Sequence, residues 1–444
     1  MPSRRPRRRA LERVRLLSAL QIREFRLLWT GMTISLLGDG VFLVAFAWQV
    51  YELSNAPAAL AAVGFAMTLP QVALLLFGGV VCDRLDRRRV MIAADVIRAL
   101  AIAAMAALSL TGALTLGSMI ALVAVYGAAT AFFGPAFDAI VPELVPPEQL
   151  TEANSLDQFV RPAALRLAGP ALGGLLVAAA GSGWAFALNA GTFAVSAGFL
   201  LAMRTRAAGC TRRQRSQSPL SEVREGFAFV RSHVWLWGTF LGAAIGYLLF
   251  TGPTEVLLPY LVKNDIEGGA GTLGAIFALG GMGAIGAAAI TAHVGMPRRH
   301  ITLMYVTWSL ATFAVAGYGL AVAPWQLMVA SMAFNALETA GLVWWATTKH
   351  RLVPASLLGR VSSLDWFISI GFVPLSYALT APVAGALGAG TTLVAAGLIG
   401  GVITLGFLFL PGMRDIERTG LAADVRLVSG APPMLSPVDP AQGR

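Results

Sequence analysis

Three acidic residues stand inside long apolar stretches of this chain, where an ionised side chain is costly. Asp39 and Glu338 each lie near the middle of such a stretch, and Glu255 lies nearer the end of another. A charged group at bilayer depth costs roughly 2.5–3.5 kcal/mol, so a retained carboxylate is expected to face a cavity or a partner. Loss of water also favours the protonated form of a carboxylate, which suits these side chains to reversible proton binding.

Asn335 lies one helical turn before Glu338 and on a similar face. A simpler interpretation exists for the acidic residues: Asp39 and Glu338 could hydrogen-bond a neighbouring helix for packing alone, and Glu255 could reach water. We expect Asp39, Glu338, Asn335 and Glu255 to contribute to proton coupling or to a substrate cavity.

Other charges in apolar stretches favour structural roles. Asp95 and Arg98 are three residues apart on one predicted helix and are expected to pair. Arg161 and Arg166 lie near the basic boundary of another, where Arg161 can extend its charged group to the membrane surface.

The composition is that of a membrane protein. Of the 444 residues, 57% are hydrophobic and only 13% are charged, whereas a soluble domain is nearer one quarter charged. The mean hydropathy is +0.70. A net charge of +10 is also found in nucleic-acid-binding proteins, but here the basic residues stand between apolar runs. Membrane topology explains them better, and no nucleic-acid partner is expected.

Twelve apolar runs of membrane-spanning length follow one another in two sets of six. A bilayer core about 30 Å thick requires roughly 20 apolar residues per helix, so twelve crossings fit within the chain. The first set is Leu27–Val50, Ala58–Val81, Met91–Leu110, Gly117–Ile140, Gln158–Ala179 and Gly183–Ala202. The second set is Val234–Leu258, Ala270–His293, Ile301–Val322, Trp325–Ala346, Leu364–Leu387 and Thr391–Phe409. The predicted fold is an all-α integral membrane protein with about twelve transmembrane helices.

Basic residues gather on one side of the predicted membrane. They occur in the N-terminal tail, the Asp83–Arg89 turn, Arg204–Arg215 and the Lys349–Arg360 connection. By the positive-inside rule both termini are expected in the cytosol and the chain in the inner membrane of the cell. The start of the chain lacks the apolar core of a secretory signal, so the first span is expected to be retained.

This topology predicts five segments. They are a basic tail (1–26), a six-helix bundle (27–203), a cytosolic linker (204–233), a second six-helix bundle (234–411) and a C-terminal tail (412–444) that is disordered at its end. Within the linker, Ser218 and Pro219 are typical of a helix start, and the apolar spacing that follows predicts an amphipathic helix.

An internal repeat relates the two bundles. Laying Leu144–Phe159 on Leu352–Phe367 at a constant offset (352 − 144 = 208) matches eight of sixteen positions. Chance gives about one match. Both copies connect the fourth and fifth predicted spans of their half, which indicates parallel repeats related by an axis along the membrane normal, with a cavity between them.

A charged turn follows the second predicted span. It reads Gly79-Val-Val-Cys-Asp83-Arg84-Leu-Asp86-Arg87-Arg88-Arg89. This segment resembles the signature loop of the major facilitator superfamily, although the family usually has glycine where this chain has Asp86. The resemblance implies that Gly79, Asp83, Arg84, Arg87 and Arg88 form a latch between the inner ends of the halves, and that the arginines contact anionic lipid headgroups. The alternative is a topology anchor alone.

Asp157 and Asp365 occupy equivalent places in the repeat, at the predicted starts of their spans. A carboxylate there complements the partial positive charge of a helix N-terminus. We group Asp365 with the latch residues.

The fifth span contains Gly169-Pro170-Ala-Leu-Gly173-Gly174, which resembles the end of a motif associated with exporters of this superfamily. Small residues permit close helix packing, and the proline bends the helix. Together with Leu37-Gly38-Asp39-Gly40 and the repeated Leu-Val-Pro connections, the motif is similar to the bacterial branch of enterobactin exporters and macrolide-efflux-like proteins. This resemblance extends from about Phe25 to Gly412.

The resemblance implies a proton-driven exporter of amphiphilic small molecules, such as drugs or a siderophore, that works by alternating access. An importer or facilitator of a nutrient is the alternative, because Val123 stands where many proton-coupled drug antiporters carry an arginine. A lipid-modifying membrane enzyme is a third, less favoured hypothesis. The sequence has no Walker loop and no His/Cys cluster with metal-ligand spacing, so we expect neither ATP hydrolysis nor a metal or other cofactor.

Overall fold

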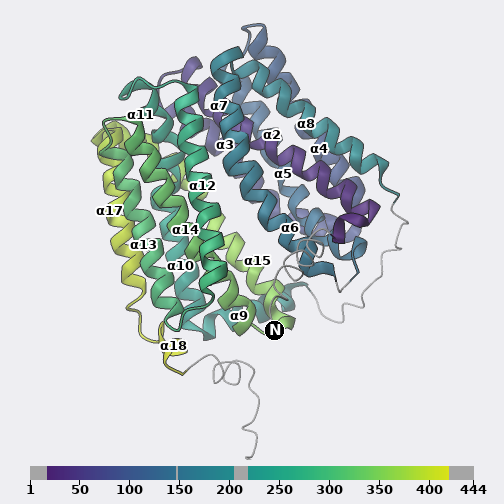
Figure 1. The fold of residues 1–444 in the computed structure, drawn as a ribbon, viewed down its shortest axis with the longest axis vertical. Coiled ribbons are helices and arrows are strands. Elements are labelled where there is room, and N and C mark those ends of the chain that lie inside the picture. Colours follow the sequence, from purple (N-terminus) through teal and green to yellow (C-terminus); the bar gives the residue numbers. More distant parts are fainter. Residues whose placement is uncertain (1–17, 147–148, 205–218, 420–444) are drawn as a thin grey trace, which may run out of the picture.

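The structure is a computed structural model that describes residues 18–146, 149–204 and 219–419. Within these ranges, twelve helical runs are long and apolar enough to cross a membrane. Figure 1 shows them as two groups that lie side by side, the first coloured purple to blue and the second green to yellow. The predicted all-α membrane fold is confirmed.

Each span corresponds to one helix or to an interrupted run of helices. The first six are α2 (Arg23–Leu53), α3 (Pro57–Arg84), α4 (Arg87–Leu110), α5 (Leu116–Leu144), the run α6 (Leu150–Pro162), η3 (Ala163–Ala168) and α7 (Gly169–Ala180), and α8 (Ser182–Ala202). The second six are the run α10 (Val234–Gly252), η4 (Pro253–Leu257) and α11 (Leu258–Asn264), then α12 (Ala270–Val294), α13 (His300–Gly319), α14 (Pro324–Leu352), the run α15 (Ala355–Gly371) and α16 (Val373–Leu387), and α17 (Ala389–Phe407). Three short helices lie outside the spans: η1 (Ser18–Gln21), α9 (Pro219–Ser232) and α18 (Asp415–Thr419).

The sequence specifies sharp reversals between neighbouring spans. Gly181 separates α7 from α8 with a φ of 87°, and Gly388 separates α16 from α17 with a φ of 85°. Residues that carry a side chain rarely adopt a backbone conformation with positive φ, so glycine is favoured at both places. The two glycines connect the fifth and sixth spans of their halves, as a repeat predicts.

Among the described residues, the hydrophobic contact between the two halves is concentrated toward one end of the molecule. One hydrophobic cluster joins α2 to the second half through residues such as Tyr51, Val256 and Val262. Two further clusters are confined to single halves, one around Met91 and the other around Trp345. The confined clusters lie near the basic end, defined here as the end with the Arg87–Arg89 turn and the Lys349–Arg360 connection. The hydrophobic cluster that the two halves share therefore lies toward the end opposite the basic end.

The contacts between halves follow the repeat. The fifth span of the first half, as η3 and α7, packs against α12, which is the second span of the other half. In return α16, from the fifth span of the second half, packs against α3, the second span of the first. These two seams hold the halves together around the space between them.

Two boundaries differ from the sequence prediction in a way that matters for the site. Helix α6 begins at Leu150 and α15 begins at Ala355, so Asp157 and Asp365 lie well inside their helices. The prediction that they complement a helix N-terminus is wrong. The reason is that these helices extend beyond the apolar core, where hydropathy no longer marks the helix start. Of the predicted tails and linker, residues 1–17, 205–218 and 420–444 lie outside the described ranges.

Candidate functional site

Asp39 lies in a polar cluster inside the first half. The Tyr126 hydroxyl of α5 donates a hydrogen bond of 2.8 Å to Asp39 Oδ1. The charges of Asp95 and Arg98 on α4 also act on this carboxylate, and Asn189 on α8 lies against the neighbouring Gly38. Four helices of one half thus converge on Asp39, and we call Asp39, Asp95, Arg98 and Tyr126 the first-half cluster.

Arg98 and Asp95 form the predicted ion pair within α4. Their side chains are 4% and 0% exposed. Arg98 Cζ also lies 4.4 Å from the ring centroids of both Phe133 and Phe193, so the guanidinium is held between two aromatic faces. The pairing was predictable from the spacing. Its closeness to Asp39 was not, because that depends on how α2 and α4 both pack against α8.

A second group of charges joins the two halves. Arg166 Nη1 on η3 lies 3.8 Å from Glu338 Oε2 on α14. Glu255 on η4 is close enough for the charges of both Arg166 and Glu338 to act on it. Segments η3 and η4 are both π-helical interruptions of their spans, a feature often found at functional sites. We call Arg166, Glu255 and Glu338 the inter-half cluster.

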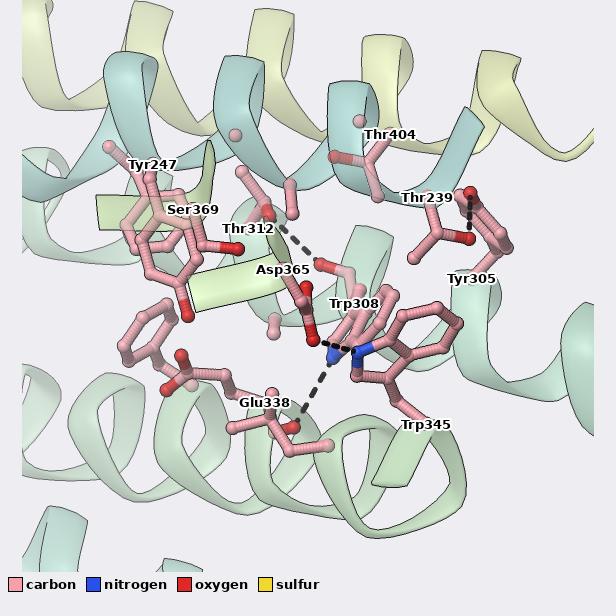
Figure 2. Close-up of a pocket in the computed structure, with 17 residues that line it drawn as sticks. Thr239, Tyr247, Tyr305, Trp308, Thr312, Glu338, Trp345, Asp365, Ser369 and Thr404 are labelled. Atoms are coloured by element: carbon pink, nitrogen blue, oxygen red, sulfur yellow. Dashed lines mark hydrogen bonds between the residues drawn. The ribbon is translucent and has the colours of Figure 1, made fainter. Parts of the chain in front are cut away.

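Glu338 also lines a cavity of about 130 Å³ in the second half. Figure 2 shows this cavity among α10, α13, α14, α15 and α17. Its walls are largely aromatic, with Tyr247, Phe250, Tyr305, Trp308, Phe334 and Trp345 among the lining residues. Two carboxylates, Glu338 and Asp365, add negative charge to this apolar surface. The arrangement suits a ligand with an apolar ring and a positive charge.

Asp365 differs from Glu338 because its charge is compensated within its own half. It forms an ion pair with Lys349 of α14. Its Oδ2 also accepts a hydrogen bond of 2.9 Å from the Trp345 indole. Asn335 does not line the cavity: its amide donates a 2.9 Å hydrogen bond to the Ser331 carbonyl and lies against Gly280 of α12.

The charged turn after α3 contacts the first half through its described arginines. Arg87 pairs with Glu143 and donates a 2.9 Å hydrogen bond to the Ala139 carbonyl. Arg88 donates to the carbonyls of Leu200 and Leu201 at 2.6 and 2.7 Å.

Asp86 caps the start of α4, because its side chain accepts hydrogen bonds from the backbone N–H groups of Arg88 and Arg89. Arg84 is exposed at the end of α3. Gly79 and Asp83 also lie on α3, but their surroundings are outside the described part of the chain.

The glycines of the exporter-type motif fill tight contacts. A Cβ at Gly169 would lie 2.6 Å from Gly40 Cα on α2, and one at Gly173 would lie 2.8 Å from the Val41 carbonyl oxygen. Gly174 instead packs across the halves, where a Cβ would lie 2.9 Å from Gly274 Cα on α12. Pro170 is buried beside them at the start of α7. The motif therefore sets both the packing within the first half and the seam between the halves.

No group of three or more His, Cys, Asp or Glu side chains with metal-binding geometry occurs among the described residues.

Two relatives of this sequence are named as efflux proteins. The chain is 27% identical over 399 residues to the multidrug efflux pump Tap of Mycolicibacterium fortuitum, covering 86% of this chain and 94% of that protein. It is 24% identical over 245 residues to macrolide efflux protein A of Streptococcus pyogenes, covering 55% of this chain and 60% of the relative.

Solved transporters have the same fold. The nucleoside transporter NupG, as a D323A mutant, superposes with a TM-score of 0.67 at 13% identity, over 87% of this chain and 99% of that one. A bacterial homologue of the iron transporter ferroportin, in an inward-facing state, gives a TM-score of 0.63 at 17% identity, over 87% and 98%. A model of the family described as transmembrane secretion effector matches residues 15–430, nearly the whole chain. The protein therefore belongs to the transmembrane secretion effector family of major facilitator superfamily transporters.

Proposed function

We propose that the protein is a proton-coupled exporter of amphiphilic small molecules in the bacterial inner membrane. Basic residues at Arg87–Arg89 and Lys349–Arg351 favour a cytosolic position for the basic end. Both termini are then cytosolic. The hydrophobic cluster shared by the halves lies toward the opposite end, so the halves would separate at the cytosolic end, where an exporter loads its substrate. The relatives named as multidrug and macrolide efflux proteins support this direction of transport.

The observation that carries the proposal is the aromatic cavity in the second half, with Glu338 at its wall. Aromatic side chains offer large rigid contact surfaces to an apolar ligand, and a few polar groups orient it. The cavity borders the space between the halves, because Glu338 is in contact with Arg166 of the first half. A substrate bound there would be carried from one opening to the other as the halves rock.

The first-half cluster is the proposed proton site. Asp39 and Asp95 share one arginine, so the cluster holds one carboxylate more than it can neutralise. A proton on Asp39 removes that surplus charge and leaves the Asp95–Arg98 pair intact. In the outward-open state Asp39 takes up the proton, and in the inward-open state it releases it to the cytosol.

The motifs identified in the sequence take their roles from this cycle. The Gly174–Gly274 seam permits close approach of the halves while they rock. In the outward-open state the charged turn, including Asp83 and Arg87, would latch the basic ends together. In the structure the described arginines of the turn bind only the first half, which agrees with a released latch.

Transport by inside-out membrane vesicles tests the proposal. Vesicles containing the protein are energised to form an inward proton gradient and given ethidium or a macrolide. We expect accumulation that collapses on addition of a protonophore, and none in vesicles without the protein. Accumulation that survives the protonophore would exclude proton coupling, and accumulation only in right-side-out vesicles would indicate an importer.

A further inference from the structure

The ion pair between Arg166 and Glu338 is loose and accessible. The separation of 3.8 Å between Arg166 Nη1 and Glu338 Oε2 is longer than a hydrogen bond. The Arg166 side chain is 45% exposed, although η3 lies in the middle of its span, so the guanidinium faces the open space between the halves. Such an ion pair can exchange partners more easily than a buried ion pair whose groups are hydrogen-bonded.

Glu338 offers its carboxylate to the cavity without another strong partner. Trp308 donates its indole hydrogen bond of 3.3 Å to the backbone carbonyl of Glu338 and not to its carboxylate (Figure 2). Among the described residues, Arg166 is the one cation within ion-pair distance of this carboxylate. Asp365, in the same cavity, already has Lys349 and Trp345.

The inter-half cluster contains more negative than positive charge. Glu255 and Glu338 share Arg166, so one carboxylate remains unbalanced when both are ionised. The charges of Glu338 and Arg166 also act on Tyr247, which lines the cavity. The cavity and the inter-half cluster therefore adjoin. A ligand with a single positive charge and an aromatic ring matches both features, with the charge at the carboxylates and the ring in the cavity.

We propose that Arg166 occupies the place of the positive group of a monocationic aromatic substrate, and that substrate binding displaces it from Glu338. This inference rests on the proposed function, because it takes the cavity as the substrate site. Displacing Arg166 breaks a contact between the halves, so loading of the site frees them to move. A neutral molecule in the cavity leaves the pair in place. Arg166 is therefore a specificity-determining residue that competes with the substrate.

Equilibrium binding of benzyltrimethylammonium to the purified protein in nanodiscs tests this role. The probe has one ring and one permanent charge, in keeping with a cavity of about 130 Å³. Calorimetry should show binding of this probe and at least tenfold weaker binding to Glu338→Gln. Arg166→Gln should bind it several-fold more tightly than wild type, because the internal competitor is gone, and Arg166→Lys should bind like wild type. Benzyl alcohol, a neutral one-ring probe, should bind all four proteins equally.

Controls separate this result from unfolding and from the proposed function. Asp265→Asn removes a carboxylate from an exposed site and should leave the affinity unchanged, and thermal unfolding of each variant reports folding. Equal or weaker binding to Arg166→Gln, or unchanged binding to Glu338→Gln, would overturn the inference. Neither result bears on proton-driven export, because binding is measured without a gradient.

Discussion

The first-half cluster and the inter-half cluster contain the same number of positive and negative charges, but the first is buried and the second is partly exposed. Each has two carboxylates and one arginine: Asp39, Asp95 and Arg98 in the first, and Glu255, Glu338 and Arg166 in the second. Arg98 is 4% exposed and lies between two phenylalanine rings, whereas Arg166 is 45% exposed and faces the space between the halves.

The difference lies in which elements supply the ion pair. Asp95 and Arg98 belong to one helix, so movement of the halves leaves their geometry unchanged. Arg166 and Glu338 come from opposite halves, so the same movement must alter their contact. A fixed pair suits a cluster that keeps a proton site in place, and a pair between moving parts suits a site that detects whether a substrate is bound.

The largest effect is expected for Arg98→Ala, which leaves Asp95 buried without its counter-charge. Removing one partner of a buried pair costs about 3–5 kcal/mol of stability. The variant should give little folded protein after extraction and a lower apparent Tm. Arg161→Ala is the matched control, because Arg161 also pairs with an aspartate on its own helix, Asp157, but is 45% exposed. That pair is worth at most about 1 kcal/mol.

The double variant Asp95→Asn/Arg98→Gln removes both charges and should recover much of the lost stability, since no unpaired charge remains. Arg98→Ala with wild-type yield and Tm would show that the enclosed pair does not stabilise the first half.

The smallest effect is expected in the charged turn. Arg87 and Glu143 are partly exposed, and such a pair contributes about 0.2–1 kcal/mol, so Arg87→Ala should slow transport by no more than about fivefold. Asp83→Asn should also slow transport with normal membrane insertion, and crosslinking across the basic end should report a shift between the open and closed forms. Arg89→Ala, at a side chain 86% exposed, serves as the control. Unchanged turnover and crosslinking in both Asp83→Asn and Arg87→Ala would contradict a latch.

The sequence was sufficient for the features that depend on local pattern. Apolar length predicted the twelve spans, the repeat predicted two equivalent halves, and the cost of a buried charge identified Asp39 and Glu338. The family model and the folds of the solved transporter structures agree with that fold.

Features that depend on how helices pack against one another were not predictable from the sequence pattern. Arg166 was placed near the membrane boundary because the start of its helix at Leu150 carries no hydropathy signal. Its pairing with Glu338 requires the packing of η3 against the second half, which no spacing in the chain encodes. Asn335 lies against Gly280 of α12 and is not among the residues that line the cavity beside Glu338. The site roles of Asp39, Glu338, Asn335 and Glu255 stay predictions.

Proton-driven uptake into proteoliposomes tests whether Asp39 couples protons to transport. Wild-type protein and Asp39→Asn are reconstituted and given an imposed pH gradient, with the substrate that accumulates in the vesicle assay. We expect a substrate gradient for wild type and none for Asp39→Asn. The variant should fold and bind substrate with unchanged affinity, because asparagine mimics the neutral form of the side chain. If Asp39→Asn builds the gradient at the wild-type rate, Asp39 is a packing residue and Glu338 is the next carboxylate to test.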